Sequence, residues 1–417
     1  YGGVGRDIFN AERTIWDSTP GSNRLNTYRY FADVGYKKKI SNFYSFSANA
    51  TYNGYMQKSI ISYQPAKFQS NDLLLEYTNF INPYKNLNIV LGGLANNISG
   101  VGVGKDYIAL GIPEIEWVAS YQDLRWALYL QADYTIMNRL KLIGGAQLNK
   151  APGIKTDIVP RIGLIFNATE EFGFKLLYGE AYKYAAQFER YANLKNSNLF
   201  GNPDLKRELV STFDAQIFYQ KPSFQLSAAY FNSTQRDLVY LKDAKIDVDF
   251  QVKRVQRFDN LNSSLLFYGF ELEGKWLPIQ QIIFSGSYSF QNNKNGEGST
   301  NNTPISNHML KTGISYTHPI FSLGFYNSYF SKPTTIITEK TTINNPEPTA
   351  FNIASLNGNL EINKIFNLKT RTQFTLNCFI NNLWDQKIYV PEYSRRFINS
   401  IPSFGGRSFL IGVAVKL

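Results

Sequence analysis

The chain has 417 residues, of which 43% are hydrophobic, 18% charged and 15% aromatic, and its formal net charge is +11 at pH 7. Its longest apolar runs are far shorter than the roughly 20 residues that a membrane-spanning helix requires, and its single cysteine, Cys378, excludes an internal disulfide and a thiolate metal cluster. Lys and Arg are scattered through the chain rather than gathered in one stripe, so the positive charge indicates anionic lipid or an anionic solute, not nucleic acid.

Alternating apolar and polar residues recur in roughly 17 segments of about 10 to 14 residues along the chain. In one of them, Phe284, Tyr288 and Phe290 alternate with serines. Because successive side chains of a strand point to opposite faces, this pattern predicts strands with one apolar and one polar face. Strands of this length, tilted near 45°, span a hydrocarbon core of about 25 Å, whereas the strands of a soluble sandwich are usually about half as long.

Short turns and long polar loops alternate between these segments. The short turns are expected at residues 36–41, 82–86, 137–139, 168–171, 220–223, 277–280, 318–320 and 363–367. The long loops include residues 183–206, 235–264, 292–307 and 332–349. A sheet that turns tightly at one rim and loosely at the other is typical of an outer-membrane β-barrel, with short periplasmic turns and long extracellular loops. The predicted fold class is therefore all-β, a transmembrane antiparallel β-barrel.

The apolar residues 99–121 are interpreted either as a loop or as an additional hairpin. Within them, Gly100, Gly102 and Gly104 alternate with valines, but the Lys-Ser/Thr pair and the strand-to-helix setting of a phosphate-binding loop are missing. This glycine run is predicted to be a flexible extracellular loop.

Two segments carry more specific patterns. Residues 175–209 read KLLYGEAYKYAAQFERYANLKNSNLFGNPDLKREL. Residues 381–389 read NNLWDQKIY, and Gly406 and Arg407 precede the last predicted strand. The Tyr-Gly-Glu-Ala and Gly-Asn-Pro-Asp-Leu-Lys of the first segment, and the Asn-Leu-Trp-Asp of the second, resemble the TonB-dependent outer-membrane receptors. The sequence departs from the family pattern at Lys183, Tyr184, Ala185, Arg207 and the terminal Leu417.

The resemblance implies a barrel of roughly 22 strands, preceded by a plug domain that pairs with TonB. Residues 1–26 show no signal peptide, and no plug precedes the first predicted strand. Residues 1–417 are therefore expected to be one partial barrel domain from the C-terminal part of a longer receptor, with the plug and the first strands missing.

Candidate ligand contacts lie in the predicted extracellular loops, where aromatic and Arg side chains offer large contact areas or pair with anionic groups. They are Tyr182, Tyr184, Arg190, Tyr191, Arg254, Arg257, Trp384, Tyr389, Tyr393, Arg395 and Arg396. His308 and His318 lie about one strand length apart at opposite rims, so they are not expected to share a metal. Acidic residues show no spacing that marks an acid and base pair. No enzyme activity, catalytic residue, metal or cofactor is predicted.

The family resemblance implies an outer-membrane active transporter that captures a scarce solute at its extracellular loops and imports it into the periplasm with energy delivered by TonB. A ferric siderophore is the expected substrate class, while glycans, cobalamin, haem and metal chelates stay open. The expected partners are the TonB complex, outer-membrane lipid and the ligand, and the protein is expected to be a monomer in the outer membrane of a Gram-negative bacterium. Two alternatives stay open: a passive diffusion porin with an even strand count, and an adhesive or structural surface-binding barrel.

Overall fold

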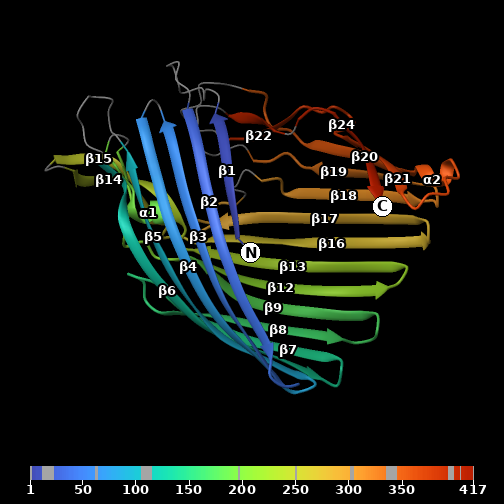
Figure 1. The fold of residues 1–417 in the computed structure, drawn as a ribbon, viewed down its shortest axis with the longest axis horizontal. Coiled ribbons are helices and arrows are strands. Elements are labelled where there is room, and N and C mark those ends of the chain that lie inside the picture. The colour runs from blue at the N-terminus through green and yellow to red at the C-terminus, as the bar shows by residue number, and fades with distance from the viewer. Residues whose placement is uncertain are drawn as a thin grey trace. The chain divides into compact units, whose positions relative to one another are not determined.

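Strands dominate the structure, as predicted. The computed structural model describes residues 2–11, 23–61, 64–104, 115–195, 198–248, 251–300, 305–334, 345–392, 399–403 and 405–416. One sheet contains 18 strands, close to the roughly 17 expected. These strands are β1 (Gly2–Ala11), β2 (Asn23–Lys39), β3 (Tyr44–Ile61), β4 (Gln64–Tyr84), β5 (Leu87–Gly104), β6 (Ile115–Ile136), β7 (Leu140–Lys150), β8 (Asp157–Asn167), β9 (Phe172–Lys183), β12 (Glu208–Lys221), β13 (Phe224–Arg236), β16 (Leu265–Ile279), β17 (Ile282–Asn295), β18 (His308–Thr317), β19 (Phe321–Phe330), β20 (Phe351–Glu361), β21 (Gln373–Asn381) and β24 (Ser408–Lys416) (Figure 1).

The chain divides into two compact units. The first unit comprises Tyr1–Leu164, Tyr178–Ser211 and Gln235–Ser264, and the second comprises Ile165–Leu177, Thr212–Thr234 and Leu265–Leu417. In the first unit, each strand from β1 to β7 pairs antiparallel with the next. In the second unit, the antiparallel ladder runs from β16 through β17, β18, β19, β20 and β21 to β24. That both units form one barrel domain stays a prediction.

Each predicted short turn lies at a connection between consecutive strands of the sheet. Between β6 and β7, Met137 and Asn138 have φ values of 50° and 57°, and the Arg139 N–H donates to the Ile136 carbonyl (3.2 Å). Two successive positive φ values characterise the type I′ turn, whose twist matches that of the flanking strands. The connection after β20 is longer than predicted because the short helix α2 (Ile362–Ile365) occupies part of it.

Strands β2 to β6 are longer than predicted, since β4 has 21 residues and β6 has 22, whereas β7 and β8 have the predicted length with 11 residues each. β5 continues through Gly100, Gly102 and Gly104, so the prediction of a flexible loop at these glycines is wrong. A Cβ atom on Gly102 would lie 2.5 Å from the ring of Phe68, and one on Gly104 would meet the ring of Trp117. The glycines are needed because aromatic rings from β4 and β6 lie close to the β5 backbone. Residues 105–114 of the same apolar segment lie outside the described residues.

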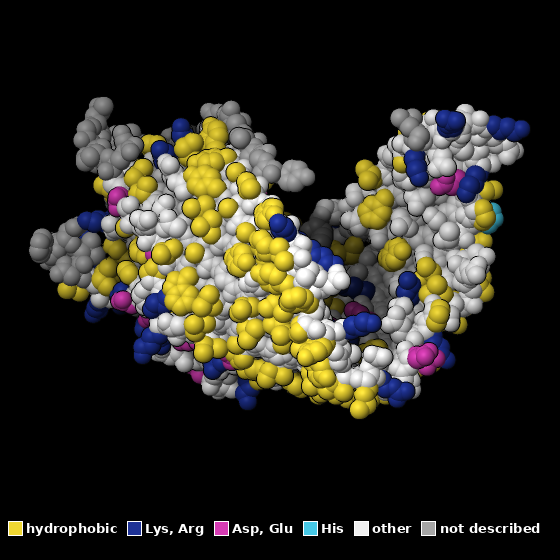
Figure 2. All heavy atoms as spheres, turned by 60° about the horizontal axis from the view of Figure 1, so that its bottom comes forward, with side chains coloured by type: hydrophobic (Ala, Val, Ile, Leu, Met, Phe, Trp, Pro, Cys, Tyr) yellow, Lys and Arg dark blue, Asp and Glu magenta, His cyan; other side chains and the backbone are white. Residues whose placement is uncertain are grey.

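The two faces of the sheet in the first unit differ in polarity, as the alternation predicts. The apolar face carries exposed side chains such as those of Val34 (72% exposed), Leu75, Leu124, Leu128 and Leu130. Figure 2 shows hydrophobic side chains gathered over one face of the molecule. Leaving a single large apolar side chain in water forfeits about 1.5–3 kcal/mol, and a contiguous apolar patch marks a membrane or protein contact.

The polar face of the first unit is crossed by hydrogen bonds between strands. Asp33 accepts from Asn49 (2.9 Å) and Thr51 (2.6 Å). Further along the ladder, the Tyr129 hydroxyl donates to Glu76 (3.0 Å). These contacts follow from the pleat, because residues directly opposite each other on paired strands share a face.

The alternation also holds in the second unit. Leu272 and Leu310 are exposed and both lie opposite Tyr288 in the register of β16, β17 and β18, whereas serines occupy the alternate positions of β17. Cys378 is exposed and lies opposite Ile411, on the face where Val413 is also exposed. Neither helix of the described residues, α1 (Gln187–Tyr191) or α2, has the length and apolar character of a membrane-crossing helix.

Regular structure also fills the predicted loops, which the sequence patterns did not indicate. Residues 183–206 and 235–264 form α1 and a second sheet of four strands, β10 (Asn193–Leu194), β11 (Leu199–Phe200), β14 (Val239–Val248) and β15 (Gln251–Asn260). We call this the loop sheet. In the second unit, β22 (Ile388–Pro391) and β23 (Ser400–Ser403) form a separate antiparallel pair.

Candidate functional site

The loop sheet joins two loops that are far apart in the sequence. β11 pairs in parallel with β15, with Leu199 opposite Gln256 and Phe200 opposite Arg257. The Gln256 N–H also donates to the Asn198 carbonyl (2.7 Å). These bonds join the predicted loops 183–206 and 235–264 to each other.

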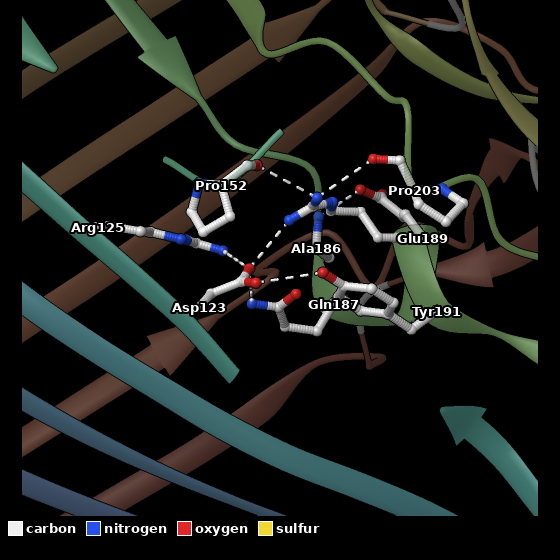
Figure 3. Close-up of polar contacts among 9 residues, drawn as sticks. Asp123, Arg125, Pro152, Ala186, Gln187, Glu189, Tyr191 and Pro203 are labelled. Carbon is white, nitrogen blue, oxygen red and sulfur yellow. Dashed lines mark hydrogen bonds and ion pairs between the residues drawn. The ribbon is translucent and has the colours of Figure 1, made fainter. Parts of the chain in front are cut away.

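A buried carboxylate on β6 fixes α1 to the main sheet of the first unit. Asp123 is 2% exposed, and its Oδ2 accepts hydrogen bonds from Arg190 Nη1 (3.0 Å), Gln187 Nε2 (3.0 Å) and Arg125 Nη2 (3.3 Å) (Figure 3). The Tyr191 hydroxyl donates to the other oxygen, Oδ1 (3.2 Å). We call these five residues the Asp123 cluster. Breaking a buried ion pair by removing one partner costs about 3–5 kcal/mol, because the remaining charge is left uncompensated.

Arg190 also binds two further segments of the first unit that connect strands. It is 6% exposed, and its Nη2 donates to the carbonyl oxygens of Pro203 (3.2 Å) and Pro152 (3.4 Å). Its guanidinium also lies 5.0 Å from the ring centroid of Tyr191. The planar five-donor guanidinium suits this task, since it can bond to a carboxylate and to backbone carbonyls at once.

The Gly-Asn-Pro-Asp-Leu-Lys segment packs directly against α1. The Gly201 N–H donates to the Ala192 carbonyl (2.7 Å), and the Asn202 N–H donates to the Glu189 carbonyl (3.0 Å). The Asn202 side chain is buried, and its Oδ1 accepts from Arg257 Nη2 of β15 (2.9 Å). This segment therefore links α1 to the loop sheet through its backbone and one amide side chain.

Two neighbouring tyrosines connect the end of β9 to β7 and β6. The Tyr182 hydroxyl donates to Asn149 Oδ1 (2.5 Å), and its ring meets that of Tyr184 edge-on with centroids 4.9 Å apart. Tyr184 lies in the loop after β9, and the Arg125 guanidinium is 5.0 Å from its ring centroid. Burial is the largest cause that raises the pKa of Tyr184 to about 12, so its phenol stays protonated at neutral pH.

The structure brings some of the predicted ligand-contact residues together and leaves others apart. Tyr182, Tyr184, Arg190 and Tyr191 surround Asp123 and Arg125, and Arg257 reaches the same region through Asn202. Arg254 is exposed on the β14–β15 hairpin. Trp384 (62% exposed) and the partly buried Tyr389 belong to the second unit. Tyr393, Arg395 and Arg396 lie outside the described residues.

Sequence reasoning missed Asp123, Arg125, Asn149 and Gln187, which complete this region. The sequence does mark Asp123 as a polar-face residue, because it occupies one of the alternate polar positions of β6, as do Arg125, Gln131 and Asp133. Nothing in the order of residues showed that its partners would come from α1, which lies 67 positions further along the chain in the case of Arg190.

The described residues give no sign of a metal centre, since no group of three or more His, Cys, Asp and Glu side chains in them is placed to hold a metal ion. The chemistry of the site is instead that of hydrogen bonds, one buried carboxylate and guanidinium groups. Such an arrangement joins the loops to the main sheet of the first unit.

Comparison with known proteins shows which family has this fold. A family model described as "TonB dependent receptor-like, beta-barrel" matches residues 1–383. A comparison with curated protein sequences finds no match.

Solved structures resemble the chain in fold. A mutant of the ferric enterobactin receptor PfeA from Pseudomonas aeruginosa is 14% identical with a TM-score of 0.75, over 100% of this chain and 66% of that one. The FrpB iron transporter from Neisseria meningitidis is 14% identical with a TM-score of 0.72, over 99% and 68%. The siderophore receptor PirA from Acinetobacter baumannii is 12% identical with a TM-score of 0.66, over 94% and 62%. The chain thus spans about two thirds of the length of these proteins, and identities this low show the fold alone.

Proposed function

The chain belongs to the family of TonB dependent receptor-like β-barrels, and from this premise we propose that it forms barrel strands and capture loops of an outer-membrane transporter. The whole protein binds a scarce solute outside the cell and imports it into the periplasm with energy delivered by TonB. The proposed substrate class is a ferric siderophore, in keeping with the iron and siderophore receptors that share the fold. The proposed partners are the TonB complex, outer-membrane lipid and the ligand, and the protein acts as a monomer in a Gram-negative outer membrane.

The observation that carries this proposal is the rigid joining of two loops to the sheet. The Asp123 cluster and the loop sheet fix α1, Gly201 and the β14–β15 hairpin together. A receptor for a dilute solute benefits from such preorganisation, because ordering mobile loops on binding would lower its affinity. A passive pore or a purely structural barrel has no comparable need for two interlocked loops.

We assign two different roles to the predicted contact residues of the first unit. Arg190 and Tyr191 act as positioning residues, because their polar groups are engaged with Asp123 and backbone carbonyls. Arg254 is the better candidate for direct contact with an anionic ligand, since its side chain is exposed on the hairpin. Trp384, Tyr389, Tyr393, Arg395 and Arg396 are proposed as further contacts from the last loop.

Uptake of radioactive iron tests the transporter proposal. A deletion strain that carries the full-length gene should take up a ferric siderophore from a panel, and an uncoupler of the proton-motive force should abolish this uptake. A porin would keep its uptake in the presence of the uncoupler. Unchanged uptake of every siderophore after deletion would refute the substrate class.

Arg254→Gln tests the proposed contact in the same strain. Hydrogen bonds to charged groups contribute about 1.5–3 kcal/mol, so we expect the KM for uptake to rise about tenfold with little change in maximal rate. Arg139→Gln is the matched control, because Arg139 is exposed in the short turn between β6 and β7. Equal effects of the two substitutions would contradict a ligand contact at Arg254.

A further inference from the structure

A shallow hollow of about 600 Å³ lies on the apolar face of the first unit. Strand register places two rows of side chains across it. The row nearer the short turns is Tyr36, Ala48, Tyr77, Gly93 and Leu128. The next row is Val34, Ala50, Leu75, Ala95 and Trp126.

Large and small side chains alternate along both rows. The residues on β2, β4 and β6 are large, and those on β3 and β5 are alanine or glycine. A Cβ atom on Gly93 would lie 2.8 Å from Leu128 Cδ2, so the Leu128 side chain covers this part of β5, and the open trough runs along β3 over Ala48 and Ala50. Val34 and Tyr36 form one wall of this trough and Leu75 and Tyr77 the other, and because neighbouring strands lie about 4.8 Å apart the two walls are about 10 Å from each other. Narrow apolar troughs of this kind suit extended methylene chains, which gain dispersion contacts along both walls.

Aromatic and polar groups close the hollow at the end near the short turns. The ring of Phe46 lies 5.9 Å from that of Tyr36 and 5.7 Å from that of Tyr77, measured between centroids. On the same face, the Tyr44 hydroxyl donates to Asn79 Oδ1 (2.8 Å). Aromatic rings with polar tips are enriched where a protein passes from hydrocarbon to the headgroup level.

One lysine stands just beyond these rings. Lys38 is exposed and lies opposite Phe46 in the register, so it shares the apolar face with Tyr36 and Val34. The side chains of Lys37 and Lys39 lie on the opposite, polar face of β2. There the Lys37 Nζ lies 5.3 Å from the ring centroid of Phe80. The apolar face of β2 therefore ends in a positive charge beside the trough on β3.

We propose that this hollow binds a phospholipid with an anionic headgroup, with an acyl chain in the trough along β3 and its phosphate paired with Lys38. The proposal rests on the proposed place of the protein in the outer membrane, in which the short turns face the periplasm. The lipid then comes from the periplasmic leaflet, because Lys38 lies at the end of β2 that leads into a short turn. A lysine close to an anionic lipid surface strengthens binding about fivefold.

Native mass spectrometry of the full-length protein in detergent tests the headgroup contact. Phosphatidylglycerol and phosphatidylcholine with the same acyl chains serve as probes, and the wild-type protein should retain the former about five times better. Lys38→Gln should remove this preference. Lys39→Gln changes the net charge by the same amount on the opposite face and should leave the preference intact.

A second pair of variants tests the trough. Ala50→Phe fills the trough on β3 and should lower retention of both lipids severalfold. Ala132→Phe makes the same change on the same face, at a position outside the hollow that lies opposite Ile89, and should have no effect. The thermal unfolding of each variant in detergent verifies that it is folded.

Three results would overturn the lipid site: equal retention of the two probes by the wild type, equal effects of Lys38→Gln and Lys39→Gln, or preferential retention of lipopolysaccharide, which belongs to the other leaflet. The lipid measurement needs no transport. If siderophore uptake fails but the preference for phosphatidylglycerol is intact, only the transporter proposal is refuted. If uptake succeeds but the preference for phosphatidylglycerol is absent, only the lipid site is refuted.

Discussion

Replacing Asp123 with Asn is expected to release α1 from β6 and to weaken the local structure of the loop by about 3–5 kcal/mol. Asn keeps the size and the acceptor oxygen of the side chain but removes its charge. The guanidinium groups of Arg190 and Arg125, the first of them 6% exposed, would then face each other without a counter-charge. Since Arg190 also holds Pro203 and Pro152, the loosening should spread to both of these connections.

Hydrogen exchange of backbone amides measures this effect. The Ala192 and Gly201 amides, which donate to the Phe188 and Ala192 carbonyls, should exchange about a hundredfold faster or more in the variant. Asp259→Asn is the control, because its ion pair with Lys242 (3.2 Å) is about half exposed and should be worth less than about 1 kcal/mol. If both variants exchange alike, the Asp123 cluster does not hold the loop. Siderophore uptake should fall only in the Asp123 variant.

Replacing Gly201 with Ala is expected to force α1 and the Gly-Asn-Pro-Asp segment apart. A Cβ atom at this position would lie 2.6 Å from the carbonyl carbon and oxygen of Arg190 and 2.7 Å from the Ala192 nitrogen. All three are backbone atoms, so no side-chain rotation can relieve the clash. Overpacking of this kind costs about 1–3 kcal/mol, and the 2.7 Å bond from Gly201 to Ala192 would be strained as well.

Gly179→Ala provides the matched control for Gly201→Ala. Gly179 belongs to the other half of the family-like pattern, but a Cβ atom there meets nothing within 4 Å. The free energy of unfolding of this variant, measured in urea, should therefore stay within about 0.5 kcal/mol of the wild type. Faster exchange at α1 in the Gly201 variant alone would confirm the close approach. A comparable loss of stability in both variants would show that the two glycines matter for another reason.

The sequence indicated several residues of this region, but it did not indicate which residues they contact. The pattern from Tyr178 to Glu208 contains Arg190, Tyr191 and Tyr182, which the structure brings into contact with Asp123 and Asn149. Their contacts come from β6 and β7, in the case of Asp123 and Arg190 across 67 positions of sequence. Single positions of a strand report which face a side chain occupies, but they carry no information on which distant loop will pack against it.

By itself the sequence determined the strands, their two faces and the positions of the short turns, because all three depend on neighbouring residues. Side-chain alternation has a period of two, and a turn needs only a few residues of suitable conformation. Only the tertiary structure decided that two polar loops form one sheet, that Gly100, Gly102 and Gly104 lie in a strand beneath aromatic rings, and that Asp123 anchors α1. These features depend on contacts between segments far apart in the chain, and such contacts exist only once the strands have been brought side by side.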